Sequence, residues 1–401
     1  MRKVSLIILV FAVAMLISLP AWAADLSGPS GPISATELKA LMGSDKVVPI
    51  YAGSKKENGF IPGSVNIPIA EFYETIDGIP KMAASREKLA DIYGKAGITP
   101  DTYVVFYSSA DDPAHPMRGA WVSGFRGHKK AYFLEGGFEK WISSGFEVSA
   151  ETTIPKPAVY DVNSLIQDDT FEATLDEVLT AYKTKSSVLV DCRNSDFQSG
   201  KEGKAVIYGT IPGSSLITLK DVLNEDFTFK PNEELQKVFA EKGIYPDTNV
   251  TTFCNTGTNA TVIRAALIYV LGYENVQNFD GSMLQWALKG LAIASQYDHF
   301  VIGARKAQIN GQLAELSAAP YLQDGRTYVP ASDLGTSLGY VVTICNGSAT
   351  FTRVPGGDVL TVDTTVTAEG INFVPLRFVA EELGFKVDWS AAGNDAKIFT
   401  P

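Results

Sequence analysis

The sequence predicts an α/β protein with two related units, each a parallel sheet flanked by helices, and a small C-terminal α+β repeat domain. Two observations support this fold class. First, short β-branched and apolar runs alternate with helical segments along residues 31–295, which is typical of parallel sheets covered by helices. Second, sequence patterns recur at fixed spacings in both parts of the chain, which indicates internal duplication.

Residues 1–24 have the pattern of a secretory signal peptide. Arg2 and Lys3 form a positively charged start, residues 4–19 are almost wholly apolar, and residues 21–23 offer an A-x-A cleavage site. We therefore expect an exported protein, secreted or held at the bacterial cell envelope. Because the apolar run is short, we expect no membrane span after cleavage, with an uncleaved anchor as the alternative.

Composition narrows the range of partners. A net charge of −11 argues against nucleic acid or an anionic membrane surface. Three cysteines are too few for a disulfide scaffold. With three histidines and no Cys-x-x-Cys motif, we expect no structural zinc site and no cofactor.

The first unit spans residues 31–151. Ser34 and Glu37 have the spacing of a capping box at a helix N-terminus. The expected elements are a helix over 35–41, a strand over 46–51, a turn and strand over 59–68, a helix around 86–93 and a strand over 103–107.

The second unit, residues 158–295, repeats this plan. The capping box returns 140 residues later at Thr174, the Ile-Pro-Gly-Ser turn at 61–64 returns 150 residues later, and the turn at 97–102 returns 146 residues later. Residues 152–157 join the two units and are stiffened by prolines.

Residues 252–260 carry the strongest chemical signal. They join a buried strand over 249–253 to a helix over 260–269, and the loop begins with Cys254. A small-residue loop at this position turns several N–H groups toward one point, where the helix dipole helps to stabilise a thiolate. The candidate cradle consists of Asn255, Thr256, Gly257, Thr258, Asn259 and Ala260. The alternative is a buried cysteine that packs as a small hydrophobe.

Four segments of the second unit match one family pattern in the right order. They are the Asp-x-Arg strand end of Asp191 and Arg193, the turn 209–214, the loop from Cys254 to Ala260, and the Trp-containing segment 278–286. Together they resemble the rhodanese sulfurtransferases, of thiosulfate or 3-mercaptopyruvate type. In the turn, Thr210 replaces the family's His.

The resemblance implies a sulfurtransferase with a persulfide on Cys254, a small-molecule sulfur donor, and a thiol or cyanide acceptor. Asp191 and Arg193 are expected to support the site. Arg193 either pairs with Asp191 and braces the site or faces an anionic donor. Cys192 between them is expected in the core, with a resolving thiol as the alternative. Because uncharged residues follow Cys254, the donor stays open.

The first unit lacks these residues. Subtracting the local spacing places Ser108 at the position of Cys254, and Ile50 and Ala52 at those of Asp191 and Arg193. We therefore expect an inactive copy, which resembles tandem sulfurtransferases. A hydrolase that uses Ser108 and His115 with Asp111 or Asp112 is the alternative, although the G-x-S-x-G motif is missing.

Residues 300–401 form a third unit with its own repeat. Segment 325–330 recurs 45 residues later as 370–375, and 338–342 recurs as 383–387. Each half reads strand–helix–strand. This pattern resembles the small module named after the N-terminal domain of copper amine oxidases.

The module resemblance implies attachment or interaction, with a partner in the cell envelope. Residues 300–401 contain no His, so the usual ligand is missing and we expect no copper site. The inactive copy and this module keep a second class of function open: a non-catalytic cell-surface binding or scaffold protein that uses rhodanese-like domains.

Overall fold

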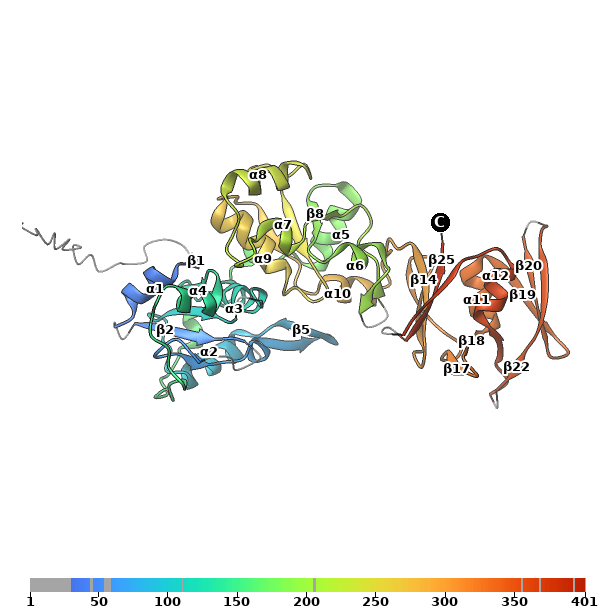
Figure 1. Cartoon of the computed structure of the whole chain (residues 1–401), viewed down its shortest axis with the longest axis horizontal. Helices are drawn as coiled ribbons and strands as arrows, with labels where there is room; N and C mark the ends of the chain where they lie inside the picture. The colour runs from blue at the N-terminus through green and yellow to red at the C-terminus, as the bar shows by residue number, and fades with distance from the viewer. Residues whose placement is uncertain are drawn as a thin grey trace, which may run out of the picture.

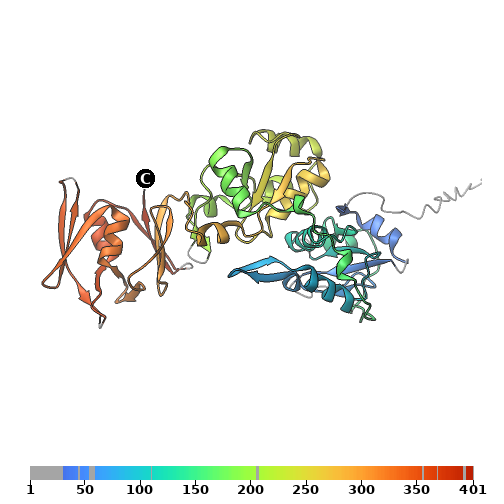
Figure 2. The same cartoon turned by 180° about the vertical axis from the view of Figure 1, so that it is seen from behind.

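The computed structural model describes residues 30–43, 46–53, 59–109, 111–204, 207–354, 356–367, 369–391 and 394–400. The expected signal peptide lies outside these residues. Two α/β copies pack together, and a strand-rich C-terminal module follows at the far side of the second copy (Figure 1). The view from behind shows the same order (Figure 2).

The first copy is built on a five-stranded sheet with the order β1-β7-β6-β2-β3, in which all neighbours are parallel. A separate antiparallel hairpin, β4–β5, projects toward the second copy (Figure 1). The strands and helices are β1 (Pro32–Ile33), α1 (Ala35–Leu41), β2 (Val47–Tyr51), β3 (Val65–Asn66), η1 (Ile69–Phe72), β4 (Tyr73–Ile76), β5 (Ile79–Ala83), α2 (Arg86–Lys95), β6 (Tyr103–Tyr107), α3 (Ala114–Phe125), β7 (Ala131–Leu134) and α4 (Gly137–Ser143).

The second copy repeats this plan with a four-stranded parallel sheet in the order β11-β8-β12-β13. Two short 3-10 turns, η2 (Val162–Ser164) and η3 (Asp169–Phe171), precede it. Its elements are α5 (Leu175–Thr184), β8 (Val188–Asp191), α6 (Ser195–Ser199), β9 (Gly203–Lys204), β10 (Ile207–Tyr208), β11 (Ser215–Leu216), α7 (Leu219–Val222), α8 (Asn232–Ala240), β12 (Val250–Phe253), α9 (Ala260–Ala265), the π-helical turn η4 (Ala266–Val270), β13 (Val276–Asn278) and α10 (Ser282–Leu288).

Both predicted capping boxes are present. The Ser34 hydroxyl accepts from the Glu37 N–H at 3.2 Å, and the Glu37 carboxylate accepts from the Ser34 N–H at 2.8 Å. Thr174 and Glu177 make the same reciprocal pair at the start of α5. These local bonds satisfy N–H groups that have no partner inside the helix, which is why sequence alone located both helix starts.

The two copies share one apolar core. A single cluster includes Phe106 and Met117 of the first copy together with Val190 and Ile263 of the second. Helices α3 and α9, which follow the equivalent strands β6 and β12, pack against each other between the sheets. The loops at the start of these two helices therefore lie at the boundary between the copies.

The C-terminal module contains three antiparallel sheets around two helices, with strand orders β16-β15-β14-β25-β24, β17-β18-β23-β22 and β19-β20-β21. Its elements are β14 (Tyr297–Val301), β15 (Lys306–Ile309), β16 (Gln312–Glu315), β17 (Tyr321–Gln323), β18 (Arg326–Pro330), α11 (Ala331–Leu338), β19 (Tyr340–Cys345), β20 (Ser348–Arg353), β21 (Val359–Asp363), β22 (Thr365–Val366), β23 (Asn372–Pro375), α12 (Leu376–Glu382), β24 (Val387–Ser390) and β25 (Asp395–Phe399). The strand–helix–strand repeat is present as β18–α11–β19 and β23–α12–β24.

The module begins before the expected residue 300. Strand β14 starts at Tyr297 and pairs along its whole length with β25 near the C-terminus. This start brings His299 into the module, where its Nδ1 lies 2.9 Å from Asp395 Oδ2. Burial lowers the pKa of His299. Among the described residues, no group of three or more His, Cys, Asp or Glu side chains is arranged to hold a metal ion.

The module is joined closely to the second copy. Ala294, in the segment that leads into the module, exchanges backbone hydrogen bonds of 2.9 and 2.8 Å with Thr210, and the Tyr208 ring stacks on His299 of the module with centroids 3.4 Å apart. The Lys397 ammonium donates to the Lys201 carbonyl at 2.6 Å. Within the described parts of the chain, no helix is long and apolar enough to span a membrane.

Candidate active site

Cys254 directly follows β12, at the edge of the second sheet where its parallel strands have their carboxyl ends. Cys254 is 4% exposed. Its N–H donates to the Ser282 hydroxyl at 3.0 Å, and its carbonyl accepts from the Met283 N–H at 3.1 Å. Ser282 itself is fully buried and has a φ of +50°. The cysteine backbone is therefore held from both sides by the start of α10.

The loop after Cys254 has free backbone donors. None of the N–H groups of residues 255–260, all of them described, donates to a protein acceptor. Of these six residues, Gly257 and Ala260 are buried. Because buried N–H groups almost always have an acceptor, this row of donors fits a bound anion or a charged sulfur.

Gly257 is required by its conformation. Its φ is +75°, and an added Cβ would lie 2.6 Å from the carbonyl oxygen of Asp280. The Asn278 amide also donates to the Gly257 carbonyl at 3.2 Å. A larger residue would strain the backbone and displace the loop that carries the free N–H groups.

Asp191 and Arg193 form a buried network beside the loop. The Arg193 guanidinium donates to both Asp191 carboxylate oxygens, at 2.9 and 2.7 Å, to the Gly209 carbonyl at 2.7 Å and to the Asn255 side-chain oxygen at 3.1 Å. The Thr210 hydroxyl completes the network by donating to Asp191 at 2.7 Å. Of the two geometries open from sequence, the structure has the pairing one, and Arg193 reaches the residue after Cys254.

The other predicted cradle side chains differ in placement. Thr258 is bonded to Tyr73 of the first copy, with 2.8 Å between the two hydroxyl oxygens. Thr256 is half-buried, and its hydroxyl makes no hydrogen bond within the described chain. Asn259 is exposed and does not cap α9. The contribution of these residues to the cradle therefore comes from their backbones.

Cys192 is buried in the apolar core, as expected, and is a neighbour of Cys254. Phe253 pairs with Asp191, so the two cysteines are the next neighbours along the parallel strands, and the Cys192 N–H donates to the Phe253 carbonyl at 2.8 Å. Both thiols are free and buried. Burial is the main cause that raises the pKa of Cys192, and repulsion from Cys254 raises it further. The Cys192 thiol therefore stays protonated.

The equivalence between the two copies differs by one residue from the sequence assignment. The bond from the Ala52 N–H to the Tyr107 carbonyl, 2.9 Å long, corresponds to the bond from Cys192 to Phe253. Tyr51 and Gly53, rather than Ile50 and Ala52, therefore stand at the positions of Asp191 and Arg193. An apolar strand pattern does not define register to one residue, whereas backbone pairing does.

Ser108 occupies the position of Cys254, as expected, but its surroundings are closed. Its hydroxyl donates to the Asp112 carbonyl at 2.6 Å and to the Ser109 carbonyl at 3.0 Å. His115 lies against the Asp112 carboxylate instead of Ser108. The hydrolase arrangement is therefore not formed, and the expectation of an unreactive first copy fits this loop.

Residues of the first copy complete the boundary of the Cys254 loop, and the sequence did not indicate them. Arg118 of α3 is fully buried and lies 2.5 Å from the Asp280 carboxylate in the second copy. The same carboxylate accepts from the Ala83 N–H at 2.7 Å. Burial raises the pKa of Tyr73, with smaller effects from Arg118 and Cys254 among its neighbours. No local pattern signals such contacts, because they exist only when the copies dock.

The duplicated parallel α/β fold and the buried cysteine at a strand-to-helix turn define the class, a rhodanese-type sulfurtransferase. The model of the rhodanese-like domain matches residues 34–144 and 174–289, and that of the copper amine oxidase N-terminal domain matches residues 296–353. The rhodanese-like matches cover more than half of the chain, so the chain belongs to the rhodanese family.

Known relatives agree with this assignment. The sulfur carrier protein TtuD of Thermus thermophilus is 30% identical over 253 residues, which cover 59% of this chain and 86% of TtuD. A thiosulfate sulfurtransferase of Cricetulus griseus is 30% identical over 231 residues, which cover 56% of this chain and 76% of that protein. The structure of SseA from Escherichia coli, described as a 3-mercaptopyruvate sulfotransferase, has a TM-score of 0.56 at 21% identity and covers 63% of this chain and 98% of its own.

Proposed function

We propose that this sulfurtransferase is exported and moves sulfane sulfur from thiosulfate or 3-mercaptopyruvate to a thiol or cyanide through a persulfide on Cys254. The observation that carries the proposal is the buried thiol followed by six N–H groups that have no acceptor among the residues the structure describes. Such a cradle stabilises negative charge on sulfur both before and after sulfur is loaded.

The reaction proceeds in two half-reactions that restore the enzyme. The Cys254 thiolate attacks the outer sulfur of thiosulfate, the sulfur–sulfur bond breaks, and sulfite leaves with the electron pair. With 3-mercaptopyruvate the carbon–sulfur bond breaks, and the pyruvate enolate leaves and takes up a proton. Cyanide or a thiolate then attacks the outer persulfide sulfur and releases the Cys254 thiolate, which gives ping-pong kinetics.

Asp191 and Arg193 have a supporting role in this proposal. Arg193 uses its donors on Asp191, Gly209 and Asn255, so it holds the first residue of the cradle instead of binding the donor. Asp191 compensates the buried guanidinium charge. Together they keep the N–H groups after Cys254 in the geometry that a charged sulfur requires.

Intact mass spectrometry tests the persulfide. We expect the mature protein to gain the mass of one sulfur after incubation with either donor and to lose it after addition of cyanide. Cys254→Ser should gain nothing, whereas Cys192→Ser, a substitution of the neighbouring thiol, should still gain sulfur. Failure to gain sulfur from either donor, while Cys254 can still be alkylated, would contradict the proposal.

Export is proposed from residues 1–24 alone, whose pattern is that of a signal peptide. Expression of the full chain in a bacterial host, followed by fractionation and N-terminal sequencing, tests it. We expect the protein outside the cytoplasm with a new N-terminus near residue 24. Retention of the full chain in the cytoplasm would overturn this part of the proposal.

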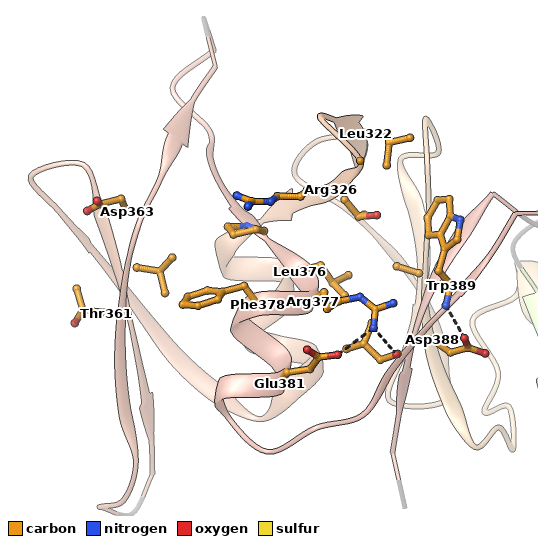
Figure 3. A pocket seen from close by; sticks show the side chains of 16 residues that line it. Leu322, Arg326, Thr361, Asp363, Leu376, Arg377, Phe378, Glu381, Asp388 and Trp389 are labelled. Atoms are coloured by element: carbon orange, nitrogen blue, oxygen red, sulfur yellow. Dashed lines mark hydrogen bonds and ion pairs between the residues drawn. The ribbon is translucent and has the colours of Figure 1, made fainter.

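The C-terminal module has a feature that favours an additional binding role. A groove of about 1010 Å³ lies beside α12, between β21 and β24 (Figure 3). Phe378 on α12 is 49% exposed, and Trp389 stands on the β24 side of the groove. The β24 edge is closed to strand addition, because Arg377 donates to the Val387 carbonyl and Asp388 accepts from the Trp389 N–H.

We propose that this groove binds a neutral polysaccharide of the cell envelope. Aromatic faces pack against the apolar faces of sugar rings, while the groove's guanidinium and carboxylate groups match hydroxyls. Its mixed charges, on Arg326, Arg377, Asp363, Glu381 and Asp388, do not favour a polyanion. Sedimentation of the full chain with purified cell-wall glycan should fall for Phe378→Ala but not for Val354→Ala, which lies outside the groove. Equal sedimentation of both variants, or binding of peptide only, would contradict it.

A further inference from the structure

The β4–β5 hairpin of the first copy reaches over to the Cys254 loop of the second. Its contacts are the Tyr73–Thr258 hydrogen bond of 2.8 Å and the bond from the Ala83 N–H to Asp280 of 2.7 Å. Lys81 lies two residues before Ala83 in this hairpin. Its ammonium is 5.8 Å from the centroid of the Tyr73 ring, whose hydroxyl contacts the loop.

The second copy contains the counterpart of this hairpin. Comparison of the two hairpins indicates the position that Lys81 takes relative to the Cys254 loop. The Phe229 N–H donates to the Glu135 carboxylate of the first copy at 2.8 Å, just as Ala83 donates to Asp280 of the second. Phe227 lies two residues before Phe229 and has a φ of +60°, and Lys81 has the same left-handed conformation, at +64°.

Phe227 lines a small cavity together with Ser108 and Ser109 at the unreactive loop. Because the two contacts are related by the internal duplication, Lys81 holds the corresponding place at the Cys254 loop. The Ser108 loop is therefore lined by a phenyl ring, and the equivalent backbone position beside the Cys254 loop carries a lysine.

Lys81 differs from the arginines described around this loop, which are already engaged. Arg193 is bound to Asp191, and Arg118 to Asp280. Arg264 on α9 is buried, donates to the Val276 carbonyl and stacks on Phe171. Lys81 is an exposed residue, and its ammonium makes no ion pair within the described chain.

We propose that Lys81, supplied by the unreactive copy, binds the anionic group of the sulfur donor and determines the preference for charged donors. The inference rests on the proposed persulfide chemistry of Cys254. The uncharged residues 255–260 after Cys254 offer no cationic side chain to the donor's sulfonate or carboxylate. A lysine across the boundary between the copies supplies that charge, and its attraction scales with the charge of the donor.

Steady-state kinetics on the full chain test this role. Lys81→Gln should raise KM about tenfold for dianionic thiosulfate and about threefold for 3-mercaptopyruvate, with little change in kcat. Lys81→Arg should restore most of the loss. Lys95→Gln, which removes an exposed lysine paired with Asp91 on α2, serves as the matched control and should leave both constants unchanged.

The charge dependence separates recognition from packing. An equal rise in KM for both donors, a fall in kcat alone, or an unchanged KM in Lys81→Gln would overturn the inference. These results are distinguishable from failure of the proposed function, in which the unsubstituted protein itself would form no persulfide. As a further comparison, Phe227→Lys at the unreactive loop should change neither constant.

Discussion

The two copies fill the equivalent space at the end of one strand with different kinds of residue. At the strand end of the second copy, Asp191, Arg193 and Thr210 form a buried ionic network. At the equivalent place in the first copy, Tyr51 packs against Phe60 and Tyr107, with ring centroids 5.2 and 5.4 Å away. A Cβ on Gly53 would lie 2.6 Å from the Tyr51 hydroxyl, so the tyrosine fills the space that Arg193 occupies in the other copy.

This difference separates folding from chemistry. The backbone bond beside the network is nearly the same length in both copies, 2.8 Å and 2.9 Å, although one site is ionic and the other aromatic. The fold therefore does not require the ion pair, and a buried ion pair is in general no more stabilising than apolar packing. We infer that Asp191 and Arg193 serve the Cys254 loop instead.

The largest expected effect concerns the exchange of the two loop residues. Cys254→Ser should lower sulfur transfer by at least about a thousandfold, because the nucleophile is lost. Adding Ser108→Cys should not restore activity, since the first loop folds onto its own carbonyls. Thiocyanate formation measures both variants, and activity in the double variant would show that the loops are interchangeable.

The ionic network offers a second test of the comparison. Arg193→Met leaves Asp191 buried and unpaired, and should lower the free energy of unfolding by about 3–5 kcal/mol. The triple variant Asp191→Tyr, Arg193→Gly and Thr210→Phe introduces the aromatic packing of the first copy into the second. It should recover much of that stability. Sulfur transfer should nevertheless stay at least about tenfold below the unsubstituted protein. Denaturant titration and kinetics on both variants separate the two effects, and an active triple variant would refute the assignment.

The contact between the copies should have an intermediate effect. Arg118→Met leaves Asp280 without its buried cation and is expected to cost about 2–4 kcal/mol. Arg118→Met combined with Asp280→Asn should cost less than the sum of the two single substitutions, because each one removes the same pair. Additive losses in chemical denaturation would show that the pair contributes no coupling between the copies.

The smallest effect is a dependence of stability on pH. Burial, followed by repulsion from Asp280, raises the pKa of Glu172 from 4.5 to about 7. Between these values the folded state holds a proton that the unfolded chain releases, so stability falls as pH rises and the loss is complete above the folded pKa. Glu172→Gln should raise Tm by a few degrees at about pH 8 and by much less at about pH 5, in calorimetric scans.

Exposed Glu151→Gln is the control for Glu172 and should leave the pH profile of Tm unchanged. A profile that stays the same in Glu172→Gln would show that another group titrates in this range.

Several parts of the fold and site were determined by local sequence. The capping boxes at Ser34 and Thr174, the strand at Tyr103–Tyr107 and the loop after Cys254 depend on residues close together in the chain. The duplication could also be recognised, since it repeats such local patterns. The pairing of Asp191 with Arg193 is also a local contact, because the residues are two positions apart, and it was one of the two geometries predicted from sequence.

Other features were decided only by tertiary structure. The strand register that makes Tyr51 the equivalent of Asp191 depends on backbone pairing between distant segments of each copy. The start of the module at Tyr297 depends on pairing with β25. The contacts of Tyr73 with Thr258 and of Arg118 with Asp280, and with them the placement of Lys81, arise from docking of the two copies. Long-range contacts of this kind leave no periodicity or motif in the chain, so the sequence predicted a candidate nucleophile, Cys254, while the docked fold determined what surrounds it.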